Sequence, residues 1–439
     1  MAMEIGIGIL GLGTVGTGVA KWLQANGALI EKRTGLKLVL RGLADIDPER
    51  DRGLELPAGL LTRDAEKVIA DPEVKIVVET IGGIEHARKY ILQALKLKKP
   101  VVTANKALLA EDASALFQEA ERNKTGIFFE ASVGGGIPVI RSLRDGLVSN
   151  NIENIYGILN GTCNYILTRM EQSHSSFAAA LKEAQKEGFA ETDPALDIDG
   201  LDTAHKAVIL ASLVCGFKVP MSAVPVEGIR ALAALDMHYA MELGYRVKLL
   251  AVINGGQDGV SVRVHPALVP HKNILASVNG VFNAVLIRGD GVGDVLGYGI
   301  GAGRDSTASA ILSDVAEAAR DLMIGAGGAG GGFCRYLSGF RPAGPGDALK
   351  PAGEEETRCY LRLTLLDKPG MFGQVGTLLG RHAISIASVL QKENCRGRHV
   401  PVIIITHHAP ENAFRAAIKE LDAMPGVGAG AVCIRIEDF

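Results

Sequence analysis

The feature that most constrains the fold is a glycine-rich turn near the N-terminus. "GILGLGTVGTGVAKWL" places Gly11, Gly13 and Gly16 in GxGxxG spacing, directly after the strand-like "EIGIGIL" and at the start of a helical pattern. In such a unit the first glycine permits a tight turn, the second lets the backbone approach a pyrophosphate, and the third lets helix and strand pack closely. A turn without a ligand is the alternative, but the strands that follow favour a dinucleotide site. Its expected contacts are Gly11, Leu12, Gly13, Thr14, Val15 and Gly16.

The first 130 residues alternate short apolar strands with helical stretches. After the glycine turn come the strand-like "LKLVLRGLAD", "KIVVET", "PVVTANK" and "GIFFEAS", separated by helical segments such as "HARKYILQALKL". This alternation is typical of a parallel sheet with right-handed crossovers. We therefore predict an α/β, Rossmann-type doubly wound domain over residues 1–130 that binds NADP or NAD.

The choice between the two cofactors depends on the end of the second strand. Asp45 stands there, where a carboxylate can accept hydrogen bonds from a ribose hydroxyl and favour NAD. It lies 29 positions beyond Gly16, further than the usual spacing of roughly 20, because "NGALIEKRTGLK" lengthens the first crossover. Arg50 and Arg52 follow closely and could instead bind a 2′-phosphate. The sequence leaves the preference open.

Two further domains follow, joined by a glycine- and proline-rich segment. Residues 131–324 mix helical and strand patterns and predict an α+β domain for substrate binding, catalysis and dimerisation. Residues 325–356 have little periodicity and predict a flexible linker. Residues 357–439 show a βαββαβ order, which predicts a ferredoxin-like unit. In the second domain we expect helices at 139–148, 161–187 and 200–216 and strands at "IYGILN", "VKLLAVI" and "GVSVRVHP".

Composition excludes several classes of function. The 439 residues are 47% hydrophobic and carry a formal net charge of −3, so no basic field would attract nucleic acid or an anionic membrane. Six scattered cysteines form neither a CxxC pair nor a Cys/His cluster at zinc-ligand spacing, which fits a reduced cytoplasm. We expect no secretion signal, because a strand-like run begins within the first few residues. The sequence contains no apolar run of roughly 18 residues and no GxxxxGK[ST] motif for a nucleoside triphosphate. We expect a cytoplasmic protein with small-molecule partners.

A cluster of acids precedes an apolar helix in the segment 188–217, "GFAETDPALDIDGLDTAHKAVILASLVCGF". Asp202 and Lys206 are four positions apart and therefore share one face of the helix. A surface ion pair worth about 0.3–0.5 kcal/mol is one interpretation. The helix continues apolar on nearly every side, however, so the pair more naturally lines a cleft. Asp193, which precedes a proline, could shape a turn, and Asp199 could cap the helix.

Five segments resemble homoserine dehydrogenases in order and spacing. They are "GLGTVG" (11–16), "VVTANKALLA" (101–110), "EASVGGGIP" (130–138), "LNGTCNYIL" (159–167) and "GFAETDPALDIDGLDTAHK" (188–206). The resemblance covers about 1–320. It implies reversible, NAD(P)-dependent reduction of L-aspartate 4-semialdehyde to L-homoserine, a step towards threonine, methionine and isoleucine. No aspartate kinase module precedes these segments, so the chain resembles the monofunctional form.

The resemblance assigns roles to the charged residues. Lys206 would donate the proton to the carbonyl oxygen, and Asp202 would bind substrate and orient that lysine. Lys106 would be a second cation between nicotinamide and substrate, although a solvated lysine at a helix start would also explain it. Glu191 would bind the amino end of the substrate, and Asp197 would line the site.

The resemblance also implies a cation and further cofactor contacts. Family members hold a monovalent cation, typically sodium, at a glycine-rich bend; a hinge between domains is the alternative. A second glycine loop would approach the nicotinamide, although an ordinary helix start explains the same letters. The positions concerned are Glu130, Val133, Gly135 and Ile137 for the cation, and Gly188 and Gly303 for the cofactor.

The C-terminal unit resembles an ACT domain through "LRLTLLDKPGMFGQVGTLLGRHAISIASVLQ" (361–391). Its loop 367–373 leaves backbone N–H groups free for a carboxylate. We expect an amino-acid effector, with threonine feedback as the first hypothesis and a purely dimerising module as the alternative, in a homodimer or homotetramer. Another semialdehyde oxidoreductase or a non-catalytic sensor would keep the same fold, but Lys106, Asp202 and Lys206 argue against a sensor.

Overall fold

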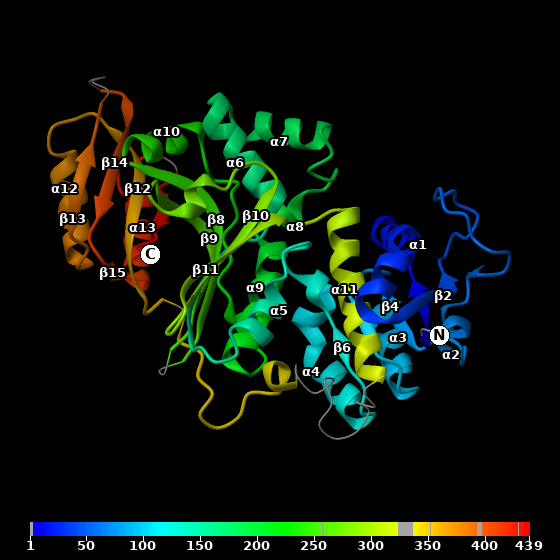
Figure 1. The fold of residues 1–439 in the computed structure, drawn as a ribbon. Helices are drawn as coiled ribbons and strands as arrows, with labels where there is room; N and C mark the ends of the chain where they lie inside the picture. Colours follow the sequence, from blue (N-terminus) through cyan, green and yellow to red (C-terminus); the bar gives the residue numbers. More distant parts are fainter. Residues whose placement is uncertain (1–2, 257–258, 324–336, 352, 393–396, 429) are drawn as a thin grey trace.

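A computed structural model describes residues 3–256, 259–323, 337–351, 353–392, 397–428 and 430–439. Along the chain the molecule passes from a parallel-sheet domain through a central mixed sheet to a smaller C-terminal unit (Figure 1). None of the helices within these ranges is long and apolar enough to cross a membrane. The four cysteines that they include are free thiols.

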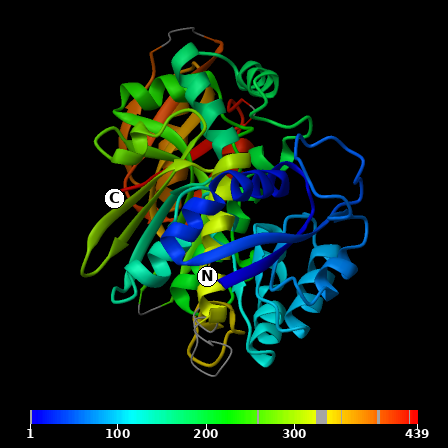
Figure 2. The same cartoon turned by 45° about the vertical axis from the view of Figure 1, so that its right-hand side comes forward.

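The first domain is a six-stranded parallel sheet with strand order β3-β2-β1-β4-β5-β6. This order confirms the predicted doubly wound fold. Helix α11 follows the central sheet in sequence but packs against α1 of this domain (Figure 1, Figure 2). Its elements are β1 (Met3–Leu10), α1 (Thr14–Thr34), β2 (Leu36–Ala44), β3 (Leu61–Thr62), α2 (Ala65–Ala70), β4 (Ile76–Glu79), α3 (Glu85–Lys96), β5 (Val101–Thr103), α4 (Lys106–Arg122), β6 (Ile127–Phe128) and α11 (Arg304–Met323).

The central domain places helices against a mixed sheet. The predicted helix 161–187 is wrong as a single element: His174 adopts the left-handed conformation and Ser176 caps a new helix. In 139–148 only three residues are α-helical before a π-turn. The elements are α5 (Val139–Arg141), β7 (Ile152–Ile158), α6 (Gly161–Ser173), α7 (Phe177–Lys186), α8 (Ala195–Ile198), α9 (Leu201–Cys215), α10 (Ala234–Glu242), β8 (Tyr245–Asn254), β9 (Ser261–Pro270), β10 (Phe282–Gly289) and β11 (Gly293–Ile300).

The C-terminal unit has the predicted βαββαβ order, with one short extra strand. Its last strand pairs in parallel with β9, so the central and C-terminal sheets form one ten-stranded sheet. Sequence patterns did not predict this junction. The elements are β12 (Glu356–Leu366), α12 (Met371–Arg381), β13 (Ile386–Leu390), β14 (His399–Thr406), β15 (Ala409–Pro410), α13 (Glu411–Asp422) and β16 (Val432–Ile436).

The segment 325–356, expected to be a flexible linker, is packed in the part that the structure describes. Its portion up to residue 336 lies outside the described residues. Phe340 is buried and stacks against aromatic rings of the first domain. The Lys350 N–H donates to the Val260 carbonyl, just ahead of β9. This part of the segment therefore contacts both earlier domains.

Candidate active site

The glycine turn has the geometry that its sequence predicts. Gly11 has a φ of 91°, and a Cβ there would lie 2.7 Å from the Thr80 carbonyl oxygen. A Cβ on Gly16 would lie 1.9 Å from the Gly11 carbonyl oxygen, whereas one on Gly13 would meet open space. Helix α1 begins at Thr14, so the N–H groups of its first turn face the open side of the sheet. The turn is therefore tight where it packs and open where a pyrophosphate would lie.

Asp45 holds the glycine turn from the end of β2. Its Oδ2 accepts a hydrogen bond from the Leu12 N–H at 2.6 Å, and its Oδ1 lies 2.8 Å from the Arg52 guanidinium. Arg52 Nε also donates to the Leu12 carbonyl at 2.9 Å. Of the two arginines considered from sequence, Arg52 is thus paired with Asp45, while Arg50 is exposed. The ion pair stands at the edge where an adenosine ribose would bind.

Glu79 is a buried acid beneath the open edge of the sheet that sequence reasoning missed. Its Oε2 accepts the Thr103 hydroxyl proton at 2.6 Å and its Oε1 accepts the Ile81 N–H at 2.8 Å. Burial raises the pKa of Glu79 in spite of these bonds. The Thr103 hydroxyl in turn accepts the Asn105 N–H at 3.0 Å. This chain of hydrogen bonds shapes the turn that precedes Lys106. The only sequence signal for Glu79 was a charged residue at the end of the apolar strand in "KIVVET".

Asp202 lies between two lysines from different domains. Its Oδ2 is 2.7 Å from Lys206 Nζ, one turn further along α9, and its Oδ1 is 3.2 Å from Lys106 Nζ at the start of α4. Lys206 is 7% exposed, which confirms that the pair stands on a buried helix. The Lys106 side chain remains 39% exposed. The predicted pair is therefore a triad that joins the cofactor domain to the central domain.

Asn160 organises the acids of this cluster. Its Nδ2 donates to Asp202 Oδ2 at 2.9 Å and to Asp197 Oδ1 at 2.7 Å, while its Oδ1 caps α6 by accepting the Cys163 N–H at 2.8 Å. Lys206 Nζ also donates to the carbonyl of the preceding residue, Leu159, at 2.6 Å. Sequence reasoning gave Asn160 no role, although a polar residue between a strand end and a helix start is a cap signal.

The two lysines control the charge of Asp202. Burial alone would raise the pKa of its carboxyl, but Lys206 and Lys106 hold that pKa well below its usual range. Asp202 is therefore a buried carboxylate that stays ionised. Burial, with the nearby Asp197 and Asp202, raises the pKa of the Cys163 thiol well above its usual value, which disfavours the thiolate that a nucleophile requires.

The other acids of the segment 188–202 differ in position. Asp197 is half-buried beside Asn160, whereas the Glu191 side chain is exposed. Asp193 shapes the turn as predicted, because its Oδ1 accepts the Ala195 N–H at 3.1 Å. Gly188 closes the end of α7 with a φ of 76°.

The prediction that Asp199 caps α9 is wrong. The N-cap of α9 is Gly200, which has a φ of 86°, and no side chain caps this helix end. Asp199 instead forms an ion pair with Arg230. A left-handed glycine at the cap turns the Asp199 side chain away from the N–H groups that it would have bound.

Glu130 ties the glycine bend to two helices. Its carboxylate oxygens accept the Ile140 N–H at 2.9 Å and the Arg141 N–H at 2.8 Å, and its own N–H donates to Asp314 Oδ2 at 2.8 Å. Burial raises the pKa of Glu130 in spite of these bonds and of nearby arginines. The Glu130 side chain is thus committed to the protein backbone.

The bend 130–138 can offer main-chain oxygens to a cation. The described ranges contain no cluster of three or more His, Cys, Asp or Glu side chains that could hold a metal. Gly134 and Gly135 have φ values of 73° and 55°, which reverse the chain and redirect its carbonyls. Carbonyl oxygens suit hard cations. The positions expected from the sequence are Glu130, Val133, Gly135 and Ile137; the carbonyls of Glu130 and Ile137 already accept the N–H groups of Val133 and Val139.

Gly303 begins the turn into α11 beside the glycine turn. Its φ is 138°, and its carbonyl accepts the Thr307 N–H at 3.1 Å. A Cβ on Gly18 of α1 would lie 2.7 Å from Arg304 Cγ, so the start of α11 contacts α1 closely. The two glycine-rich loops are therefore neighbours.

Comparison with known proteins gives a consistent result over the whole chain. Family models match in order: "Homoserine dehydrogenase, NAD binding domain" over residues 11–130, "Homoserine dehydrogenase" over 138–316 and "ACT domain" over 360–426. A homoserine dehydrogenase from Neisseria gonorrhoeae is 40% identical over 436 residues, which are 99% of each chain. One from Pseudomonas aeruginosa is 39% identical over 437 residues, again 99% of each chain.

Solved structures agree. A homoserine dehydrogenase from Thiobacillus denitrificans is similar with a TM-score of 0.90 at 38% identity, covering 99% of this chain and 98% of that one. A hyperthermophilic archaeal homoserine dehydrogenase in complex with NADPH has a TM-score of 0.62 at 28% identity, covering 72% of this chain and 98% of that one.

Proposed function

The chain belongs to the homoserine dehydrogenase family, and from that premise we propose how its residues carry out the reversible, NAD(P)-dependent reduction of L-aspartate 4-semialdehyde to L-homoserine. The observation that carries the proposal is the position of Asp202 between Lys206 and Lys106, where the cofactor domain meets the central domain. Amino-acid biosynthesis is the setting of this reaction, on the route to threonine, methionine and isoleucine.

Lys206 is the proton donor in this proposal. A bound nicotinamide would supply the hydride. Negative charge would develop on the aldehyde oxygen, which therefore needs an acid beside it. Lys206 is held by two acceptors, the Asp202 carboxylate and the Leu159 carbonyl, so its ammonium has a fixed direction. In the oxidation of homoserine the same nitrogen receives the hydroxyl proton.

Lys106 and Asp202 complete the charge arrangement. The half-exposed Lys106 ammonium can approach a substrate oxygen and stabilise its charge, because its contact with Asp202 uses only part of its hydrogen-bonding capacity. Asp202 keeps both ammonium groups close together by neutralising their repulsion. Glu191 and Asp197 provide carboxylates for the substrate's ammonium, with Asp197 held in place by Asn160.

We assign the cofactor preference to Asp45 and Arg52. The two side chains neutralise each other, so Asp45→Ala should free Arg52 for a 2′-phosphate and remove a carboxylate that would repel it. We expect the ratio of kcat/KM for NADP to that for NAD to rise by about tenfold or more in this variant. An unchanged ratio would show that Asp45 does not determine which cofactor is bound. The NADPH complex of the archaeal relative supports testing both cofactors.

A sodium ion in the bend 130–138 would have a structural role. Its ligands would be main-chain carbonyls, because the Glu130 carboxylate already accepts two N–H groups. Such an ion would hold the link between the first two domains. Replacing sodium chloride with choline chloride at constant ionic strength should lower the melting temperature, and an unchanged value would argue against the ion.

The ACT unit is proposed to bind an amino-acid effector, with threonine as the first candidate. Helix α12 begins at Met371 after Gly370, whose φ is 89°, and a groove between this turn and α13 is lined by Thr377, Arg381 and Glu420. Backbone N–H groups at such a turn suit a carboxylate. If saturating threonine leaves the activity unchanged, the effector is another amino acid or the unit only dimerises.

We also propose a homodimer or homotetramer. β11 is at one edge of the ten-stranded sheet, and three of its exposed side chains are apolar: Leu296, Tyr298 and Ile300 are 38%, 54% and 49% exposed. An edge strand with exposed apolar residues invites pairing with a second copy. Light scattering during size-exclusion chromatography measures the mass directly. A monomer at micromolar concentration would contradict this proposal.

One assay tests the function as a whole. Purified protein is mixed with L-homoserine and either NAD or NADP, and the absorbance of the reduced cofactor is followed. We expect turnover with at least one cofactor. The absence of turnover with both cofactors would refute the proposed activity. Turnover of a different hydroxy amino acid instead of homoserine would leave the fold assignment unaffected but would identify another substrate.

A further inference from the structure

Two arginines of the ACT unit, the buried Arg435 and the partly buried Arg362, contact the central domain. They stand on adjacent strands: Arg435 on β16, the strand that pairs with β9, and Arg362 on β12, which pairs with β16. Each forms a paired contact with one carboxylate of the central domain, Arg435 with Glu227 and Arg362 with Asp236. The two bridges differ in the segment of the central domain to which the carboxylate belongs.

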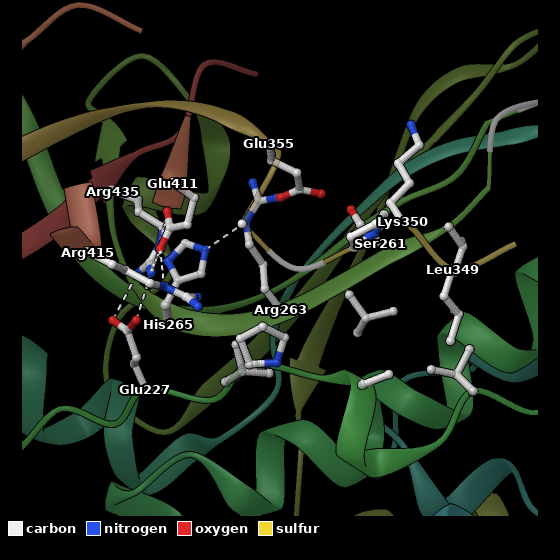
Figure 3. Close-up of a pocket in the computed structure, with 18 residues that line it drawn as sticks. Glu227, Ser261, Arg263, His265, Leu349, Lys350, Glu355, Glu411, Arg415 and Arg435 are labelled. Atoms are coloured by element: carbon white, nitrogen blue, oxygen red, sulfur yellow. Dashed lines mark hydrogen bonds and ion pairs between the residues drawn. The ribbon is translucent and has the colours of Figure 1, made fainter. Parts of the chain in front are cut away.

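Arg435 binds a carboxylate on each of two sides. Its Nη1 and Nη2 donate to the two carboxylate oxygens of Glu227 at 2.8 and 2.7 Å, and its Nε donates to Glu411 of α13 at 2.9 Å. Figure 3 shows Arg435 between these two acids, at the edge of a pocket that also contains His265 and Arg263. The Arg435 side chain is 8% exposed. Its geometry is therefore set by the ACT unit, and it sets that of Glu227.

Glu227 belongs to a short segment wedged against the end of α8. The Glu227 N–H donates to the Val264 carbonyl of β9 at 2.8 Å, and the Ile229 N–H donates to the Ile198 carbonyl at 2.8 Å. Between them, Gly228 lies so close that a Cβ would be 2.2 Å from the Ile198 carbonyl oxygen. A side chain at residue 228 would clash with the end of α8. Because the segment is packed this closely and is hydrogen-bonded to Ile198, we expect a shift of Glu227 to move Ile198 as well.

Ile198 is flanked by the acids of the active site. Asp197 precedes it in α8, and Asp202 lies one turn beyond it in α9. Asn160 joins these two carboxylates through hydrogen bonds of 2.7 and 2.9 Å. A displacement at Ile198 would therefore change the spacing between Asp197 and Asp202.

We propose that Arg435 is a positioning residue for the substrate site. Held by Glu411, it fixes Glu227, and through the segment 227–229 it fixes the end of α8 and the acids on either side of Ile198. The inference rests on the proposed function, because it assigns substrate binding to those acids. It makes the ACT unit part of the scaffold of the site, with a route to the acids that does not involve the loop 367–373.

The second bridge is a matched control. Arg362 donates to Asp236 at 2.6 and 3.1 Å, and the Tyr360 hydroxyl donates to it at 3.0 Å. Asp236 is buried in the first turn of α10 and also accepts the Ala233 N–H at 2.8 Å. This bridge joins the same two domains but ends on α10, which begins at Ala234, five residues after Ile229. Breaking this bridge should weaken the contact between the ACT unit and the central domain without moving α8.

The test compares Glu227→Gln with Asp236→Asn in the full-length protein. Each change removes one charge and keeps the size of the side chain. The Glu227 side chain is 45% exposed and that of Asp236 is fully buried, so the loss of stability should be larger in Asp236→Asn. For Glu227→Gln we expect the KM for homoserine to rise by at least about fivefold, with kcat and the cofactor KM within about twofold of the wild type. For Asp236→Asn we expect a lower melting temperature and an unchanged KM for homoserine.

A double-mutant cycle and hydrogen exchange complete the test. Glu227→Gln combined with Arg435→Gln should raise KM no further than the larger single effect, because both break one bridge. Amides in 195–202 should exchange faster in Glu227→Gln than in Asp236→Asn, and this measurement does not depend on turnover. Equal KM values in the wild type and Glu227→Gln, or an equal rise in Asp236→Asn, would overturn the proposal. A wild type without homoserine turnover would refute the proposed function instead, leaving hydrogen exchange to decide the positioning role.

Discussion

Two clusters of buried carboxylates lie at domain junctions and have opposite electrostatics. In the first, Asp202 lies between Lys206 and Lys106, which overcome the effect of burial and hold its pKa well below the usual range. In the second, burial raises the pKa of Asp314 well above its usual value, and the nearby Glu130 adds to the rise. Asp314 also contacts Arg141, but at 3.4 Å and without reversing the shift.

The difference shows what separates a working acid from a structural one. The partners of Asp314 are groups of the protein that are already bonded. The Glu130 N–H donates to Asp314 itself, and Arg141 also forms an ion pair with Glu317 at 2.7 Å. The Arg141 side chain is 35% exposed and that of Lys106 is 39% exposed, so exposure does not separate the two cations; Lys106 differs because it comes from another domain than Asp202. Burial of an acid is thus no sign of function by itself. A buried ion that holds a reachable opposite charge is a stronger sign.

The sharpest way to separate the clusters is to neutralise one acid in each. Asp202→Asn should lower kcat/KM for homoserine by about 10²- to 10³-fold, because two ammonium groups lose the carboxylate that keeps them together. Asp314→Asn should stay within about threefold of the wild type, because the contacts that it changes are those with Glu130 and Arg141 and not those of the lysines. Steady-state kinetics of both variants decide the matter. Similar losses in the two variants would remove the distinction between the clusters.

The pH dependence of stability should mark the second cluster. Because the pKa of folded Asp314 is raised, the folded protein keeps a proton that the unfolded chain loses near pH 4. The free energy of unfolding should therefore fall as the pH rises from about 4 towards the folded pKa, and Asp314→Asn should be spared that part of the loss. Urea unfolding at a pH of about 4 and at a pH of about 7 measures the difference. Parallel curves for the two proteins would show that Asp314 is ionised when folded.

A smaller effect should follow from loosening the first cluster. Asn160→Ala removes a helix cap and the bonds that hold Asp197 and Asp202 together. We expect a loss of about 1 kcal/mol in stability and a rise of about fivefold in the KM for homoserine. Ser176→Ala, which removes the cap of α7 alone, is the control and should affect stability only. An unchanged KM in Asn160→Ala would mean that the substrate does not depend on these acids.

Local patterns were enough to predict much of this molecule. The GxGxxG turn between a strand and a helix led to the parallel sheet, and the periodicity after residue 357 led to the βαββαβ unit. The spacing of Asp202 and Lys206 led to their ion pair. Each of these features depends on residues close in sequence, where chain geometry permits few alternatives.

Contacts between distant segments escaped prediction. Lys106 reaches Asp202 only because α4 and α9 pack together, and Asn160 reaches the same acid from a third element. The pairing of β9 with β16 likewise depends on tertiary packing, as do the bridges made by Arg435 and Arg362. The break at His174 left a weak local signal in the polar residues "HSS", which the apolar periodicity on either side concealed.

The most direct test is the turnover of Lys206→Ala beside that of Lys106→Ala, each with saturating cofactor and a full range of homoserine concentrations. We expect Lys206→Ala to lose about 10²- to 10⁴-fold in kcat with little change in KM, as a proton donor acting in the transition state should, and Lys106→Ala to lose less in kcat. Near-normal kcat in Lys206→Ala, or a larger loss in Lys106→Ala, would contradict the assignment of Lys206 as the donor.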